Sequence, residues 1–119
     1  MNANLQLDLS GQNLPAFLEV RKAIIGDDMA VHRALPTRML RSVGHWCFLD
    51  HMGPHDFDTQ DQGLHVGAHP HIGLQTFTWM IDGEIMHRDS LGNEQVISAG
   101  QVNLMTAGRG ISHTEDSVG

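Results

Sequence analysis

Two short motifs hold the residues best suited to bind a metal ion, His-Pro-His at residues 69–71 and His-Thr-Glu at residues 113–115. In each motif the two donor side chains are two residues apart, and in an extended strand such residues project from the same face. If the two strands lie side by side, three imidazoles and one carboxylate point into one space. This donor set suits a borderline divalent ion such as Fe²⁺, Mn²⁺, Co²⁺, Ni²⁺ or Zn²⁺. The sequence therefore predicts a metal centre formed by His69, His71, His113 and Glu115.

The donor types favour a reactive centre over a structural one. Structural zinc sites prefer thiolates in closed tetrahedral shells, and the chain has a single cysteine, Cys47. Three imidazoles and one carboxylate leave open positions on a six-coordinate ion. Among the other histidines, His87 is a candidate to orient a ligand imidazole from outside the metal's own shell. The remaining candidates are predicted to be surface or hydrogen-bonded residues: His45, His51, His55 and His65.

Composition excludes several classes of partner and location. The 119 residues suffice for one domain, and a formal charge of −7 argues against a nucleic-acid backbone as a partner. No stretch approaches the roughly 18 apolar residues of a membrane span, and the first residues lack a signal-peptide pattern. A lone Cys47, expected to be a small buried hydrophobe, fits a reducing cytoplasm.

Short apolar runs separated by turn residues predict an all-β chain. Residues 1–16 are polar and are expected to form a flexible N-terminal arm, ahead of a domain that covers residues 17–119. Gly, Pro and Asp-Gly signals break that domain into short strands, which is typical of an antiparallel sandwich or barrel. The Asp-Gly pair at residues 82–83 predicts a hairpin between the strands on either side of it. The expected strands cover residues 17–25, 29–35, 39–51, 75–81, 84–89, 94–98, 101–106 and 111–116, with a short helix as the alternative for 17–25. The core is expected to contain Trp46, Phe48, Phe77 and Trp79, unless one of them lines a substrate cavity.

The spacing around both metal motifs resembles that of the cupins. The sequence segments around the motifs resemble those of the pirin family, which belongs to the cupins. Gly63 precedes the His-Pro-His motif by the distance of the first cupin signature. Gly100 begins a segment similar to the second signature, with Thr106 in place of its proline and His113 two residues beyond the usual histidine position. The segments that resemble pirins are residues 33–36 (RALP), 48–54 (FLDHMGP), 69–74 (HPHIGL), 82–84 (DGE), 87–92 (HRDSLG), 105–110 (MTAGRG) and 111–115 (ISHTE).

The resemblance implies a cupin jelly-roll β-barrel with one metal ion, Fe²⁺ first among the candidates, bound at His69, His71, His113 and Glu115. It implies quercetin 2,3-dioxygenase activity, in which a flavonol-like aromatic substrate is opened with O₂ and Glu115 takes the proton of the substrate hydroxyl. The alternative that it implies is a non-catalytic, metal-binding module that regulates a transcription factor or a metabolic enzyme.

Length is the main departure from the family pattern. Pirins resemble two cupin domains in tandem, and the 119 residues correspond to the N-terminal one. The segment at 111–116 is therefore expected at an unpaired sheet edge, in a single barrel that is incomplete or is completed by a partner chain in a homodimer.

Overall fold

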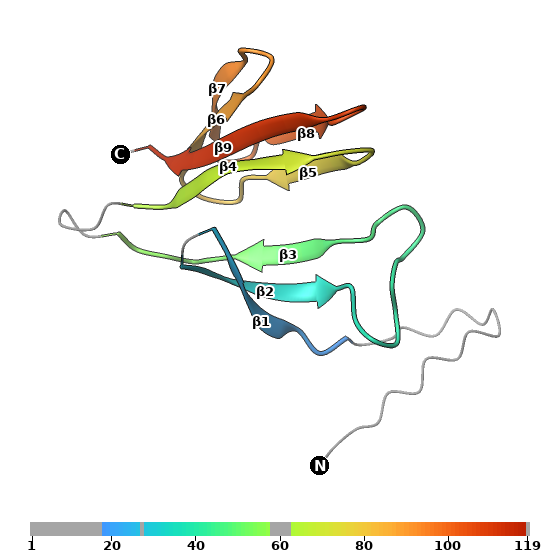
Figure 1. The fold of residues 1–119 in the computed structure, drawn as a ribbon. Coiled ribbons are helices and arrows are strands. Elements are labelled where there is room, and N and C mark those ends of the chain that lie inside the picture. The colour runs from blue at the N-terminus through green and yellow to red at the C-terminus, as the bar shows by residue number, and fades with distance from the viewer. Residues whose placement is uncertain (1–17, 27, 58–62, 119) are drawn as a thin grey trace. The chain divides into compact units, whose positions relative to one another are not determined.

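The computed structural model describes residues 18–26, 28–57 and 63–118, and the regular secondary structure in them is entirely β-strand (Figure 1). This confirms the predicted all-β class. The predicted N-terminal arm, residues 1–16, lies outside the described residues. No helix in the described part of the chain is long and apolar enough to cross a membrane. The strands are β1 (Arg21–Ile25), β2 (Met29–Leu35), β3 (Leu49–Met52), β4 (His65–His71), β5 (Gln75–Trp79), β6 (Glu84–Asp89), β7 (Glu94–Ser98), β8 (Val102–Thr106) and β9 (Ile111–Ser117).

The chain divides into two units, of which the first is built on the sheet β1-β2-β3. Strands β2 and β3 pair antiparallel, and Arg33 forms a bidentate ion pair with Asp50 across them, with both N···O distances 2.7 Å. The predicted long strand at 39–51 is wrong, since only β3 joins the sheet. Gly44 adopts a φ of 56° inside a small loop closed by hydrogen bonds between Val43 and Trp46, and this interrupts the extended backbone.

The second unit contains a four-stranded antiparallel sheet with the order β4-β9-β6-β7 and a two-stranded sheet, β5-β8. Strand β9 pairs with β4 on one side and with β6 on the other. The predicted edge position of residues 111–116 is therefore wrong. This strand is hydrogen-bonded to a neighbour on each side, so its two predicted metal ligands lie on an internal strand of the sheet.

The predicted Asp82-Gly83 hairpin is also wrong. The turn does form, with Gly83 at a φ of 76° and its N–H donated to Asp82 Oδ1. However, β5 pairs with β8 through its full length, and β6 pairs with β7 and β9. The turn thus carries the chain from one sheet to the other. The hairpin prediction failed because an Asp-Gly turn signal does not specify which strand each flanking strand pairs with.

The core of the second unit is aliphatic. Leu64, Val66, Ile85 and Ile97 pack together, and Met29 and Met80 lie against them. A smaller cluster contains Met105, Ala107 and Ile111. The aromatic core predicted from the sequence is wrong, and Cys47 is half-buried. In β5, for example, alternation turns the threonines to the half-buried face and the aromatics Phe77 and Trp79 to the exposed face. Trp46 and Phe48 are exposed as well.

Candidate metal centre

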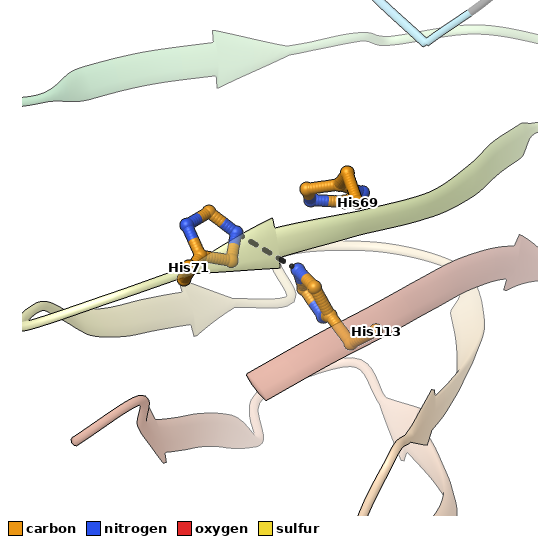
Figure 2. Close-up of side chains that lie close together, drawn as sticks. All are labelled: His69, His71 and His113. Carbon is orange, nitrogen blue, oxygen red and sulfur yellow. Dashed lines mark hydrogen bonds between the residues drawn. The ribbon is translucent and has the colours of Figure 1, made fainter. Parts of the chain in front are cut away.

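Three of the four predicted ligands converge between two neighbouring strands of the second unit. His69 and His71 lie on β4, His113 lies on β9, and the register places His69 directly opposite His113 (Figure 2). The candidate ligand atoms of these three imidazoles all lie within 4.8 Å of one another. The pairing of the two motifs that strand geometry predicts is therefore present in the structure.

A β-bulge in β4 puts the histidines on the same side as the core. The register passes from Val66 opposite Glu115 to His69 opposite His113, so β4 has one residue more than β9 between these two pairs. In a regular strand Val66 and His69 would face opposite sides, because side chains alternate. The extra residue restores a common face, which is how bulges re-aim side chains near functional sites.

The spacing of one nitrogen pair, which forms a hydrogen bond in this structure (Figure 2), fits a shared metal ion. His71 Nε2 and His113 Nε2 are 3.2 Å apart, and the ring centroids of the three histidines are separated by 4.4 to 5.0 Å. Two imidazole nitrogens at metal–nitrogen distances of about 2.0–2.1 Å stand about 2.8–3.4 Å apart at tetrahedral or octahedral angles. The observed separation lies within this range.

The His69 ring is held in the tautomer that a ligand needs. Its Nδ1 lies 2.9 Å from the carbonyl oxygen of Gly67, which belongs to the bulge. Because a carbonyl only accepts, Nδ1 carries the hydrogen and the lone pair is on Nε2. A backbone carbonyl in this role is a common way to orient a metal-binding imidazole.

Burial keeps two of these imidazoles neutral. Desolvation, followed by the neighbouring rings of His69, His87 and His71, lowers the pKa of His113 to about 4, while Asp89 acts in the opposite direction. Desolvation, followed by the proximity of His69, also lowers the pKa of His71. Neutral rings keep their lone pairs, so these groups need not lose a proton before they coordinate.

Glu115, the fourth predicted ligand, stands apart from this cluster in the described structure. It lies on β9, opposite Val66 of β4 and His87 of β6, and is half-buried. Desolvation raises the pKa of its carboxyl group, and the nearby His69 and His87 partly oppose that rise. Its direct ligation remains a prediction.

A second pair of polar residues extends the centre into β6. His87 is buried, and its Nδ1 lies 3.3 Å from Nδ1 of His113. Its Nε2 lies 3.3 Å from Oδ2 of Asp89, and side-chain hydrogen bonds from Asn93 contribute most to lowering the pKa of this carboxyl group to about 2. The sequence analysis missed Asp89, although His87 and Asp89 repeat the two-residue spacing of both ligand motifs. The histidines predicted at the surface are exposed: His45, His51, His55 and His65.

A polar cavity of about 270 Å³ adjoins the far side of this pair. Its walls come from β6 to β9 and the turns between them, and the three clustered histidines are not among its lining residues. The polar residues that line it are His87, Asp89, Asn93, Gln95, Asn103 and Thr106.

Comparison with known proteins identifies the family. The pirin family model matches residues 28–119, which covers both metal motifs. The chain belongs to the pirin family. A protein of Pseudomonas aeruginosa named "Putative quercetin 2,3-dioxygenase PA1205" is 64% identical over 98 residues, which are 82% of this pirin-family chain and 31% of that protein. A "Pirin-like protein" of Caulobacter vibrioides is 47% identical over 98 residues, 82% of this chain and 34% of its own length.

A solved structure agrees with the fold of this pirin-family chain. Quercetin 2,3-dioxygenase from Acinetobacter baumannii superimposes with a TM-score of 0.79 at 61% identity, over 83% of this chain and 33% of that one. The cupin-type all-β fold predicted from the sequence is thereby confirmed. The chain spans about one third of the length of these relatives.

Proposed function

We propose that this pirin-family chain carries the metal centre of a dioxygenase of the quercetin 2,3-dioxygenase type, which opens a flavonol-like ring with O₂. The observation that carries the proposal is the convergence of His69, His71 and His113 from two paired strands, with two ligand nitrogens 3.2 Å apart. Fe²⁺ is the proposed ion, and Mn²⁺, Ni²⁺, Co²⁺ and Zn²⁺ suit the same donors. The relatives that bear the name of this activity support the reaction class.

The three imidazoles would hold the ion, and Glu115 would supply the carboxylate of the predicted set. When bound, such an ion supplies Lewis acidity that lowers the pKa of a coordinated hydroxyl group. The two imidazoles whose pKa is lowered enter the centre neutral, and Gly67 fixes the ring of the third.

Glu115 is proposed as the base that takes the proton of the substrate hydroxyl on a carboxylate oxygen. A base must hold the proton that it accepts, and burial raises the pKa of this carboxyl group in that direction. Its place on the same strand as His113, near enough to His69 and His87 for both rings to act on its pKa, supports this role.

Metal binding is the first test. The metal-free chain is titrated with Co²⁺ and, without oxygen, with Fe²⁺, and the variants are His71→Ala and His65→Ala. His65 is a matched control, since it lies on the same strand but is exposed and contacts Asp116. We expect one equivalent of metal in the wild type and in His65→Ala, and much weaker binding in His71→Ala. Equal binding by all three proteins would overturn the proposed centre.

Turnover is the second test. Quercetin is bound to the Fe²⁺-loaded chain without oxygen, and its absorbance is followed after air is admitted. We expect metal-dependent loss of the flavonol band. A chain that binds metal and quercetin but shows no turnover would contradict the enzyme and favour the metal-binding regulatory module.

Substitution of Glu115 separates its two proposed roles. Metal retained and turnover lost in Glu115→Gln would support the base, whereas metal lost together with turnover would assign Glu115 to the ligand shell. Full turnover in this variant would contradict both roles.

A further inference from the structure

We propose that Asp89 and His87 act as positioning residues, which fix the tautomer and ring orientation of His113 so that its Nε2 lone pair faces the metal centre. The inference rests on the proposed function insofar as His113 is a ligand. It deepens that proposal, because a chain of hydrogen bonds that begins at a turn outside the centre sets the tautomer and ring orientation of His113 for metal binding.

The relay begins at a carboxylate that is firmly held. Asp89 Oδ1 accepts hydrogen bonds from the backbone N–H groups of Leu91 at 2.9 Å and Asn93 at 3.1 Å. The side-chain amide of Asn93 donates to Oδ1 at 3.0 Å and to Oδ2 at 2.8 Å. With Oδ1 fixed by the β6–β7 turn, Oδ2 is the oxygen that faces His87.

The carboxylate of Asp89 sets the direction of the relay. An ionised carboxylate only accepts, so His87 must donate to Asp89 from Nε2. With this as the single ring hydrogen of His87, its lone pair is on Nδ1, and His113 donates to it from its own Nδ1. The lone pair of His113 is therefore on Nε2, the atom that lies 3.2 Å from Nε2 of His71.

The relay lies within the sheet. The side chains of His87 and Asp89 are only 6% and 3% exposed, although both also line the polar cavity. In the register of β6 with β9, Asp89 lies opposite His113 and His87 lies opposite Glu115. No buried polar side-chain atom in the described residues lacks a hydrogen-bond partner, and this includes the buried polar atoms of the relay.

This geometry predicts that Asp89→Asn reverses the relay. The two backbone donors favour an oxygen at the Oδ1 position, so the new NH₂ group takes the place of Oδ2 and donates to His87. There it also meets the side-chain NH₂ of Asn93, which donates to Oδ2 at 2.8 Å in the wild type and must turn its oxygen towards residue 89. His87 then carries its hydrogen on Nδ1 and donates to His113, whose hydrogen moves to Nε2 and blocks the ligand atom. Asp82→Asn is the matched control, since Asp82 is an exposed turn residue whose side chain accepts from Gly83.

Two substitutions of His87 provide a matched pair of similar size. In His87→Gln the amide oxygen accepts from His113 and the NH₂ group donates to Asp89, so the direction of the relay is kept. His87→Leu removes both bonds. This pair also tests the relay if Asp89→Asn does not fold.

The experiment reads the tautomers of the metal-free chain by long-range ¹H–¹⁵N correlation of the histidine rings, and then measures Co²⁺ affinity. We expect His113 to carry its hydrogen on Nδ1 in the wild type, Asp82→Asn and His87→Gln, and on Nε2 in Asp89→Asn. His87→Leu should lose the fixed tautomer. Co²⁺ affinity should fall about 10–100-fold in Asp89→Asn and His87→Leu, the usual effect of losing a partner of a metal ligand.

A wild-type His113 protonated on Nε2, or the same tautomer in the wild type, Asp89→Asn and His87→Leu, would overturn the relay. If the tautomers follow the prediction but the wild type binds no metal, the relay is supported and the proposed function fails. The two proposals are thus tested separately.

Discussion

At the scale of single residues, the centre is a group of buried and half-buried imidazoles, and the pKa of two of them, His71 and His113, is lowered. His113 is surrounded by His69 and His71 of β4 and by His87 of β6, and its pKa is lowered to about 4. The one anionic group joined to this cluster by a described side-chain hydrogen bond is Asp89, which contacts His87 and not the clustered ligands. The lowered pKa of His71 and His113 leaves these two rings neutral and able to bind a cation.

Replacing Asp89 with Asn should destabilise the protein by about 1–3 kcal/mol at neutral pH, because a buried acceptor of several hydrogen bonds is lost. The pKa of this carboxyl group is about 2 in the folded chain and 3.8 in an unfolded one. The ionised carboxylate thus adds stability above about pH 4, and this contribution is lost as the pH falls towards 2. Urea unfolding of the wild type and the variant between pH 7 and pH 3 should show the difference shrinking, and Asp82→Asn is the control. A difference that stays constant over this range would contradict the prediction.

The ligand motifs could be read from the sequence because the two-residue spacing has one geometric meaning in a strand. Asp89 could not be read in the same way, since an Asp before Ser-Leu-Gly-Asn also fits an ordinary turn. Its role depends on β6 lying next to β9, which no local pattern reveals. The position of Glu115 opposite Val66 likewise depends on the bulge between Val66 and His69.

At the scale of strands, β9 is the element on which the second unit depends. It joins β4 to β6 and contributes His113, Glu115 and Ser117 to one face. A strand paired on both sides has its N–H groups in two ladders, whereas the edge strand β7 is paired with β6 alone in the described sheet.

Hydrogen–deuterium exchange should therefore be slower in β9 than in β7, despite the place of β9 near the C-terminal end of the chain. The physical reason is that exchange in β9 requires the loss of pairing with two neighbours. Exchange in β9 as fast as in β7 would show that this strand behaves as an edge, as expected from the sequence.

The close approach of Gly63 to Ser117 makes the start of β4 sensitive to a single methyl group. A Cβ at Gly63 would lie 2.1 Å from Ser117 Oγ, which accepts the N–H of Leu64 at 3.0 Å, and Gly63 also has a φ of 70°. Gly63→Ala should cost about 1–3 kcal/mol in the free energy of unfolding from strain and the lost hydrogen bond.

Gly83→Ala is the control for this prediction, because its φ is 76° but a Cβ there would meet nothing within 4 Å. The control should cost less, since it adds backbone strain without a clash. Equal losses in chemical denaturation would mean that the contact with Ser117 adds nothing.

The strand boundaries were easier to predict than the pairing. Residues 29–35 and 94–98 form strands with the expected ends, because Pro, Gly and Asp residues flank them. The partner of residues 75–79 is β8, far from the adjacent Asp-Gly turn, and this choice depends on long-range packing. The long strand expected at 39–51 failed because its apolar composition does not show that Gly44 leaves the extended conformation.

At the scale of the whole molecule, metal should stabilise the folded chain by mass action, since the unfolded chain does not bring the ligands together. At a free metal concentration 100-fold above the Kd, the gain is about 2.7 kcal/mol. Differential scanning calorimetry with Co²⁺ and with EDTA should show a Tm that rises with metal concentration. His113→Ala should remove the dependence, and an unchanged Tm in the wild type would contradict specific binding to the native state.

A homodimer that completes the barrel remains a prediction from the sequence. The internal position of β9 means that the three clustered histidines come from one chain, so the described cluster does not need a second copy. Light scattering on the metal-loaded chain measures its mass directly.

The strand order β4-β9-β6-β7 also has a consequence for biosynthesis. The ribosome makes β4, β6 and β7 before it makes the strand that separates β4 from β6. The four-stranded sheet therefore cannot be completed until β9 has emerged, and His113 arrives with that strand. A nascent chain stalled short of residue 111 holds His69 and His71 without their partner, so the cell can load the centre only after this part of the protein has been translated.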